Sequence, residues 1–71
     1  MNEMPILVEG EIVKALKPEL YEIRLPNGKS TLGHLSKSLR SEGVELVSGQ
    51  RLELEMTPFD FDSGRISRII E

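Results

Sequence analysis

Seven basic or imidazole side chains fall in two stretches of the sequence that contain no Asp or Glu. One stretch runs from Arg24 to Ser41 and the other from Ser63 to Ile70. Guanidinium, ammonium and imidazole groups bind phosphate oxygens. If the fold places both stretches on one face, that face is positive although the net charge is −3. The alternative is chance clustering in a short chain. The residues concerned are Arg24, Lys29, His34, Lys37, Arg40, Arg65 and Arg68.

The segment Thr57–Ile66 is predicted to deliver one of these arginines to such a face. Pro58 lacks an N–H, so a central strand should stop near it. Asp60–Gly64 is rich in turn-forming residues, and Gly64 can adopt a positive φ at little cost. This interpretation places Arg65 just past a turn, at the start of a strand, where it suits phosphate binding. The alternative is an ordinary hairpin loop with one solvated arginine.

The sequence offers no arrangement that predicts catalysis or a metal site. His34 is the only histidine, and no neighbouring acid supports it as a catalytic base. Ser36 and Ser38 have no partner at triad spacing. Asp60 and Asp62 lack the calcium-loop pattern, and turn capping explains them better. We therefore expect no enzymatic activity, no catalytic residue, no metal and no cofactor. For His34 a structural role and a contact to RNA both remain open.

Chain length and composition limit the class of protein to which this sequence can belong. The 71 residues suffice for one small domain, so residues 1–71 are predicted to form a single domain, with residues 1–5 as a loose N-terminal end. There is no Cys, which excludes disulfides and thiolate metal sites. No apolar stretch approaches the roughly 20 residues of a spanning helix. We expect a cytoplasmic monomer with no membrane partner.

The first half of the chain predicts three strands. In Ile6–Val13 alternate residues from Ile6 to Ile12 share one face, and Gly10 marks a bend or a close backbone approach. Leu20–Leu25 alternates with Tyr21 toward the core, and Lys29–Leu35 returns as its partner. Asn27-Gly28 between them predicts a two-residue turn of type I′, which needs two positive φ values, or a close relative of it, with Leu25 and Lys29 near the strand ends.

The second half predicts a short helix and two more strands. Ser36 can cap a helix and Gly43 can end it. Val44–Gln50 is predicted as a loop, Arg51–Met56 as the fourth strand and Arg65–Ile70 as the fifth. Five strands with a helix between the third and fourth indicate an all-β, five-stranded Greek-key OB-fold barrel. An SH3-like barrel is the competing fold.

Two motifs resemble the bacterial translation initiation factor one family. His34-Leu35-Ser36 with Arg40 resembles the family's His-Ile-Ser-Gly-Lys-x-Arg segment. Thr57-Pro58-Phe59-Asp60 with Gly64-Arg65-Ile66 resembles its Thr-Pro-Tyr-Asp…Gly-Arg-Ile segment. The likeness runs from about Val8 to Ile66. The sequence departs from the family at Lys37–Ser41, where the family is more basic, and in its overall acidity.

The resemblance implies an RNA-binding initiation factor that contacts ribosomal RNA at the decoding (A) site of the small ribosomal subunit and works with the other initiation factors. The resemblance assigns RNA binding to His34, Ser36, Arg40 and Arg65. It adds Lys29, which lies where the outer sheet face of the family approaches RNA. Charge adds Arg24, Lys37 and Arg68 to this set. The acids of the sheet, Glu9, Glu11, Glu53 and Glu55, are expected to lie mostly elsewhere. The alternative function is a non-ribosomal OB-fold module that binds single-stranded nucleic acid or protein.

Overall fold

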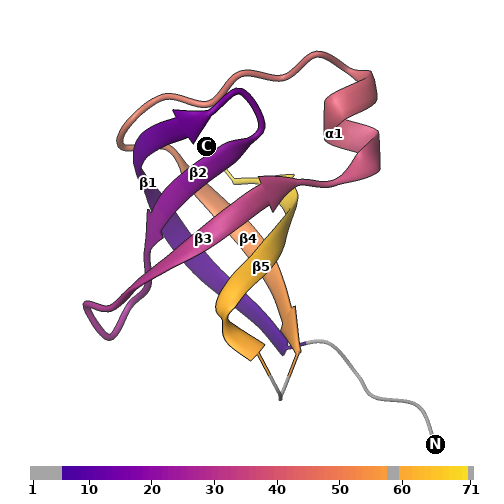
Figure 1. Ribbon diagram of the computed structural model, residues 1–71. Helices are drawn as coiled ribbons and strands as arrows, with labels where there is room; N and C mark the ends of the chain where they lie inside the picture. The colour runs from indigo at the N-terminus through magenta and orange to yellow at the C-terminus, as the bar shows by residue number, and fades with distance from the viewer. Residues whose placement is uncertain (1–5, 58–59, 71) are drawn as a thin grey trace, which may run out of the picture.

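The computed structural model describes residues 6–57 and 60–70, and these residues form five strands and one short helix (Figure 1). Along the chain the elements are β1 (Ile6–Lys17), β2 (Leu20–Arg24), β3 (Ser30–Leu35), α1 (Lys37–Ser41), β4 (Arg51–Thr57) and β5 (Asp60–Ile69). The prediction of a loose N-terminal end at residues 1–5 lies outside the described residues, and the prediction of a single domain stays a prediction.

The strands close into a barrel in the order β1-β2-β3-β5-β4, with β4 returning to β1. Only the β3–β5 pair is parallel among these neighbours, and the others are antiparallel. In Figure 1, α1 lies between the end of β3 and a long loop that crosses one end of the barrel to reach β4. The predicted five-stranded OB-fold barrel, with its helix between strands 3 and 4, is confirmed.

Alternation along the strands builds the core, as the sequence predicts. Over most of their length the strands turn every second side chain inward, whereas in β1 no residue after Ile12 is buried. Tyr21 is only 3% exposed, and its hydroxyl accepts a hydrogen bond from the Leu46 N–H over 3.3 Å. This bond ties the loop after α1 to β2 and closes that end of the barrel. The buried apolar residues are Ile12, Tyr21, Ile23, Leu35, Leu46, Leu52, Leu54, Met56 and Ile66.

Three glycines let the strands pack closely around this core. A Cβ on Gly10 or on Gly33 would overlap the side chain of Ile23, which lies between them. Gly33 is paired with Gly64 across the parallel β3–β5 ladder. A Cβ on Gly64 would lie 3.0 Å from Met56 Cγ and 3.1 Å from the Glu55 carbonyl oxygen. The close approach predicted at Gly10 is therefore confirmed.

The β2–β3 turn differs from the predicted type I′ turn. Gly28 has a φ of +87°, but Asn27 does not have a positive φ. The Gly28 N–H donates to the Leu25 carbonyl over 2.9 Å, so Pro26 and Asn27 occupy the centre of the turn. Pro26 favours the first central position of an ordinary turn, and this moves the turn back by one residue. Gly28 then supplies the left-handed residue that completes a three-residue loop.

The predicted turn at Asp60–Gly64 is wrong, because these residues belong to β5. The pairing of Ser63 with Leu32 and of Gly64 with Gly33 continues the parallel ladder through this segment. Gly64 does not adopt a positive φ. Glycine is needed at this position because a Cβ would come too close to Met56 and to the Glu55 carbonyl. Thr57 pairs with Asp60, and the connection between them at residues 58 and 59 lies outside the described residues. Arg65 consequently lies within a strand and not at its start.

Candidate nucleic-acid interface

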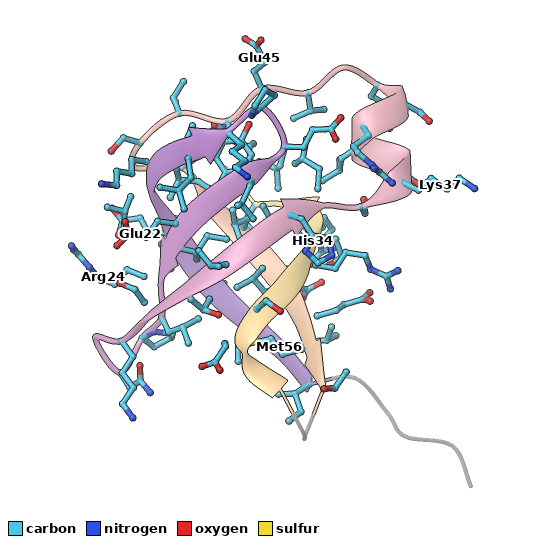
Figure 2. All side chains as sticks on the ribbon, in the orientation of Figure 1. Glu22, Arg24, His34, Lys37, Glu45 and Met56 are labelled. Carbon is cyan, nitrogen blue, oxygen red and sulfur yellow. The ribbon has the colours of Figure 1, made fainter. Side chains whose placement is uncertain are left out.

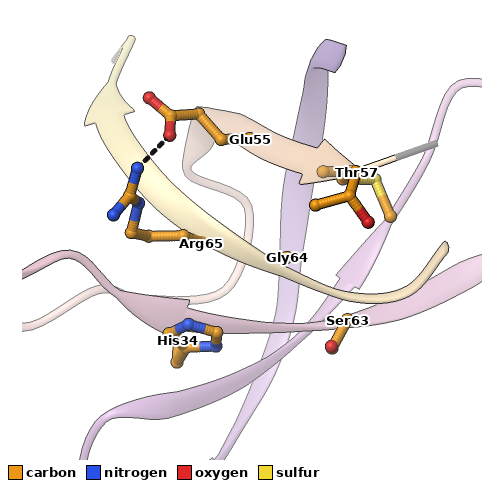
Figure 3. A pocket seen from close by; sticks show the side chains of 7 residues that line it. His34, Glu55, Thr57, Ser63, Gly64 and Arg65 are labelled. Atoms are coloured by element: carbon orange, nitrogen blue, oxygen red, sulfur yellow. Dashed lines mark hydrogen bonds and ion pairs between the residues drawn. The ribbon is translucent and has the colours of Figure 1, made fainter. Parts of the chain in front are cut away.

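Two adjoining open pockets lie along the outer side of β5 and share Glu55 and Arg65. One, of about 340 Å³, extends from His34 toward Thr57 and Ser63. The other, of about 300 Å³, extends from Ser36 and Lys37 to Ser67. We call the two together the β5 groove. Figure 3 shows its first half, with Arg65 and Glu55 in contact and His34 on the neighbouring strand.

Strand register positions the side chains of this groove. His34 is opposite Arg65 in the parallel β3–β5 pairing, and both side chains are exposed. Arg65 is also opposite Glu55 in the antiparallel β4–β5 pairing. Because successive residues of a strand alternate between faces, Leu35 and Ile66 next to them point into the core. A row of three polar side chains therefore crosses the outside of the barrel.

The start of α1 is fixed against the same strand. The Ser36 N–H donates to the Ile66 carbonyl over 3.0 Å, which attaches the residue before the helix to β5. The Ser36 hydroxyl accepts the N–H of Leu39 over 3.3 Å, and Gly43 follows the helix with a φ of +69°. Both predicted helix ends are confirmed. Ser36 therefore holds Lys37 at the groove through helix capping.

Ion pairs contradict the expectation that the acids of the sheet lie away from the basic residues. Arg65 forms an ion pair with Glu55, and Arg68 lies 3.7 Å from Glu53. Cross-strand pairing brings these charges together, because β4 carries glutamates at the positions facing the arginines of β5. The outside of β5 is therefore a mixed surface and not a positive one.

The structure brings together four of the predicted RNA-binding residues in the β5 groove: His34, Ser36, Lys37 and Arg65. Arg68 lies further along β5, outside the groove lining. Arg40 faces the β1–β2 turn, where its guanidinium lies 3.7 Å from the Glu19 carboxylate.

The remaining two predicted residues lie at the β2–β3 hairpin. Arg24 ends β2, and Lys29 follows the turn, where its N–H donates to Asn27 Oδ1 over 3.0 Å. Figure 2 shows Arg24 and Lys37 on opposite sides of the molecule. The basic residues that charge clustering assigned to one positive face are thus spread over the hairpin, the groove, the β1–β2 turn and the far end of β5.

Sequence reasoning did not place Glu55, Ser63 or Ser67 at this site. The sequence does not give the pairing register of β5. Without that register it is not known which residues of β4 and β3 lie opposite Arg65 and line the groove with it. The alternation in Arg51–Met56 showed that Glu55 points outward, but it could not show which residue faces it.

Residues 6–57 and 60–70 contain no group of three or more His, Asp or Glu side chains placed to hold a metal ion. Among the same residues no helix is long and apolar enough to cross a membrane.

The fold is similar to that of two solved structures, although the sequence matches no protein-family model. The solution structure of translation initiation factor one from the Wolbachia endosymbiont strain TRS of Brugia malayi is similar, with a TM-score of 0.76 and 26% identity over 96% of this chain and 80% of that one. The predicted resemblance to initiation factor one is confirmed.

A second solved structure, YjeQ from Thermotoga maritima, shares the fold. It matches with a TM-score of 0.73 and 21% identity over 93% of this chain. The matched part is only 23% of the YjeQ chain, so the same barrel also occurs as a part of a longer protein.

Proposed function

We propose that this chain is an RNA-binding translation initiation factor that binds the small ribosomal subunit at the decoding (A) site through contacts to ribosomal RNA. The observation that carries the proposal is the match to a structure of initiation factor one along nearly the whole chain. The β5 groove adds support, because it unites His34, Ser36 and Arg65 from the two motifs that resemble the family.

In this proposal the groove binds RNA mainly through its backbone. Arg65 and Lys37 contact phosphate oxygens, and charge-assisted hydrogen bonds of this kind are the strong ones. His34, exposed beside Arg65, contacts a base or a phosphate. Ser36 keeps Lys37 in place by capping α1. Arg24 and Lys29 at the hairpin, with Arg40 and Arg68, make outlying phosphate contacts. We propose that the protein acts as a cytoplasmic monomer with the other initiation factors, as a binding protein and not as an enzyme.

A titration of labelled protein with purified small subunits, at low and at moderate salt, tests this function. Lys37→Ala should weaken binding by about tenfold, because a charged hydrogen bond is worth about 1.5 kcal/mol. Arg65→Ala should weaken it by less, because Arg65 gives up its ion pair with Glu55 on binding. Lys37→Ala should also lower the slope of log affinity against log salt by roughly 0.7–0.9, the value for one lost phosphate contact, and Arg65→Ala should lower it by less.

Two matched variants control for the loss of charge. Arg51 is also a strand arginine in an ion pair, with Glu9 at 2.9 Å, and its side chain is 53% exposed against 56% for Arg65. Arg51→Ala should bind like the parent, and so should Lys14→Ala, which removes an exposed lysine of β1. Absence of binding to small subunits at low salt would refute the proposal. Equal losses in all four variants would refute the assignment of the groove.

A further inference from the structure

Glu55 occupies the position in the groove where it can hold Arg65 against any ligand. The two residues are directly paired across β4 and β5, and the Arg65 guanidinium donates to Glu55 Oε1 (Figure 3). Glu55 also lines both pockets of the groove. A phosphate that enters the groove therefore meets a carboxylate already bound to the arginine it needs.

The burial of the two partners is unequal, and this decides which one moves. The side chain of Arg65 is 56% exposed, whereas that of Glu55 is only 26% exposed. Arg65, the more exposed partner, can turn toward a ligand, whereas the more enclosed Glu55 keeps its place in the groove lining. A half-buried carboxylate left without its partner loses favourable interactions, and it also repels the incoming phosphate.

We infer that Glu55 competes with RNA phosphate for Arg65 and thereby sets the affinity and the salt response of the groove. The inference deepens the proposed function and rests on it. Binding then consists of an exchange in which Arg65 leaves one carboxylate and gains one phosphate oxygen. The net gain is the difference between two charged contacts, and it is smaller than a free arginine would supply.

The exchange of the Glu55 carboxylate for a phosphate at Arg65 should be visible in how the RNA affinity depends on salt concentration. When a free arginine binds a phosphate, the condensed cation at that phosphate is released. When Arg65 leaves Glu55, the carboxylate it leaves behind attracts a cation in return, which cancels part of this release. The parent protein should therefore show a shallower salt slope than a variant without the carboxylate. A purely structural role of Glu55 would leave the slope unchanged.

Glu55→Gln tests the inference, because glutamine keeps the shape of the side chain and removes its charge. Glu9→Gln is the matched control, since Glu9 also forms an ion pair, with Arg51, outside the groove. Both variants change the net charge equally. Binding is measured to small subunits and to a short RNA duplex, over a series of salt concentrations, after thermal unfolding has shown that both variants fold.

The expected result is that Glu55→Gln binds both RNAs more tightly than Glu9→Gln, on the order of threefold at low salt, as expected for one exposed ion pair. Its salt slope should be steeper, by less than the roughly 0.7–0.9 of one full phosphate contact. In an Arg65→Ala background the gain from Glu55→Gln should shrink, because no arginine remains to be released.

The outcomes separate the inference from the proposed function. If the parent binds small subunits but Glu55→Gln and Glu9→Gln behave alike on both RNAs, the inference is overturned and the proposed function stands. If no variant binds small subunits but Glu55→Gln gains on the duplex, the ribosomal function fails and the competition is retained for another RNA. If Glu55→Gln gains nothing on either RNA, competition for Arg65 is excluded.

Discussion

The packing of Ile23 against two glycines predicts a large effect from a single methyl group. Ile23 is fully buried, and its Cδ1 atom occupies the space that a Cβ on Gly33 would need. The same Cβ would also lie 3.2 Å from Ile66 Cγ1 and from Leu54 Cδ2. Gly33→Ala therefore overpacks a closed core, and such changes cost about 1–3 kcal/mol.

The net destabilisation of Gly33→Ala should be about 1–2 kcal/mol. Replacing glycine by alanine also restricts the unfolded chain, which returns about 0.4–1 kcal/mol. For a domain of this size each kcal/mol lowers the melting temperature by roughly 4–8 °C. Urea denaturation gives the free energy of unfolding directly, and thermal unfolding provides the second measurement.

A second substitution identifies the atom responsible. Ile23→Val removes Cδ1, and alone it should cost about 0.5–1.5 kcal/mol. Combined with Gly33→Ala it should recover stability, so that the double variant is less destabilised than the sum, by about 1 kcal/mol. Gly10→Ala is the matched control. Its Cβ would overlap Cγ2 of Ile23, which valine retains, so Ile23→Val should not rescue it.

The reasoning would be refuted if the destabilisations of Gly33→Ala and Ile23→Val simply added in the double variant. It would also be refuted if Ile23→Val restored the stability of Gly10→Ala to the same extent. The result also bears on the groove, because Gly33 precedes His34 and is paired with Gly64, which precedes Arg65. A displacement of either strand in the core would shift these two exposed side chains.

Two further substitutions test local features. Gly28→Val should destabilise the domain by roughly 1 kcal/mol or more, because a β-branched residue resists the φ of +87° at this turn; an unchanged urea midpoint would contradict this. Tyr21→Phe removes the acceptor for the buried Leu46 N–H and should cost about 1–3 kcal/mol in the same assay. Its amide hydrogen at residue 46 should exchange faster, and unchanged protection would show that the bond is dispensable.

Structural features that are set by residues within a single strand or helix were predictable from the sequence. Alternation in Leu20–Leu25 and Arg51–Met56 placed Tyr21, Leu52 and Leu54 in the core, because side-chain direction in a strand has a period of two residues. Helix capping by Ser36 depends on a few neighbouring residues, and it was predictable for the same reason.

Features that depend on tertiary pairing were not predictable. Asp60–Gly64 has the composition of a turn, yet parallel pairing with β3 makes it a strand, and local propensity yields to such pairing. The turn at Asn27-Gly28 differs for a local reason, since the preceding Pro26 shifts it by one residue. There the dipeptide favours a type I′ turn, and the residue next to it decided the structure.

The pairing of charges on the outer face of β5 depends on a β-bulge that the spacing of residues in the sequence does not predict. Glu53 and Glu55 are two residues apart on β4, whereas their partners Arg68 and Arg65 are three apart on β5. A bulge accommodates the difference, with Ser67 as the extra residue, and the Ser67 hydroxyl donates to the Glu53 carbonyl over 3.2 Å. Without this bulge only one of the two pairs could face its partner, because a shift of one residue turns a side chain to the other face. The same bulge therefore joins both arginines of β5 to glutamates, and charge counted along the sequence overstates the positive charge on the outer face of β5.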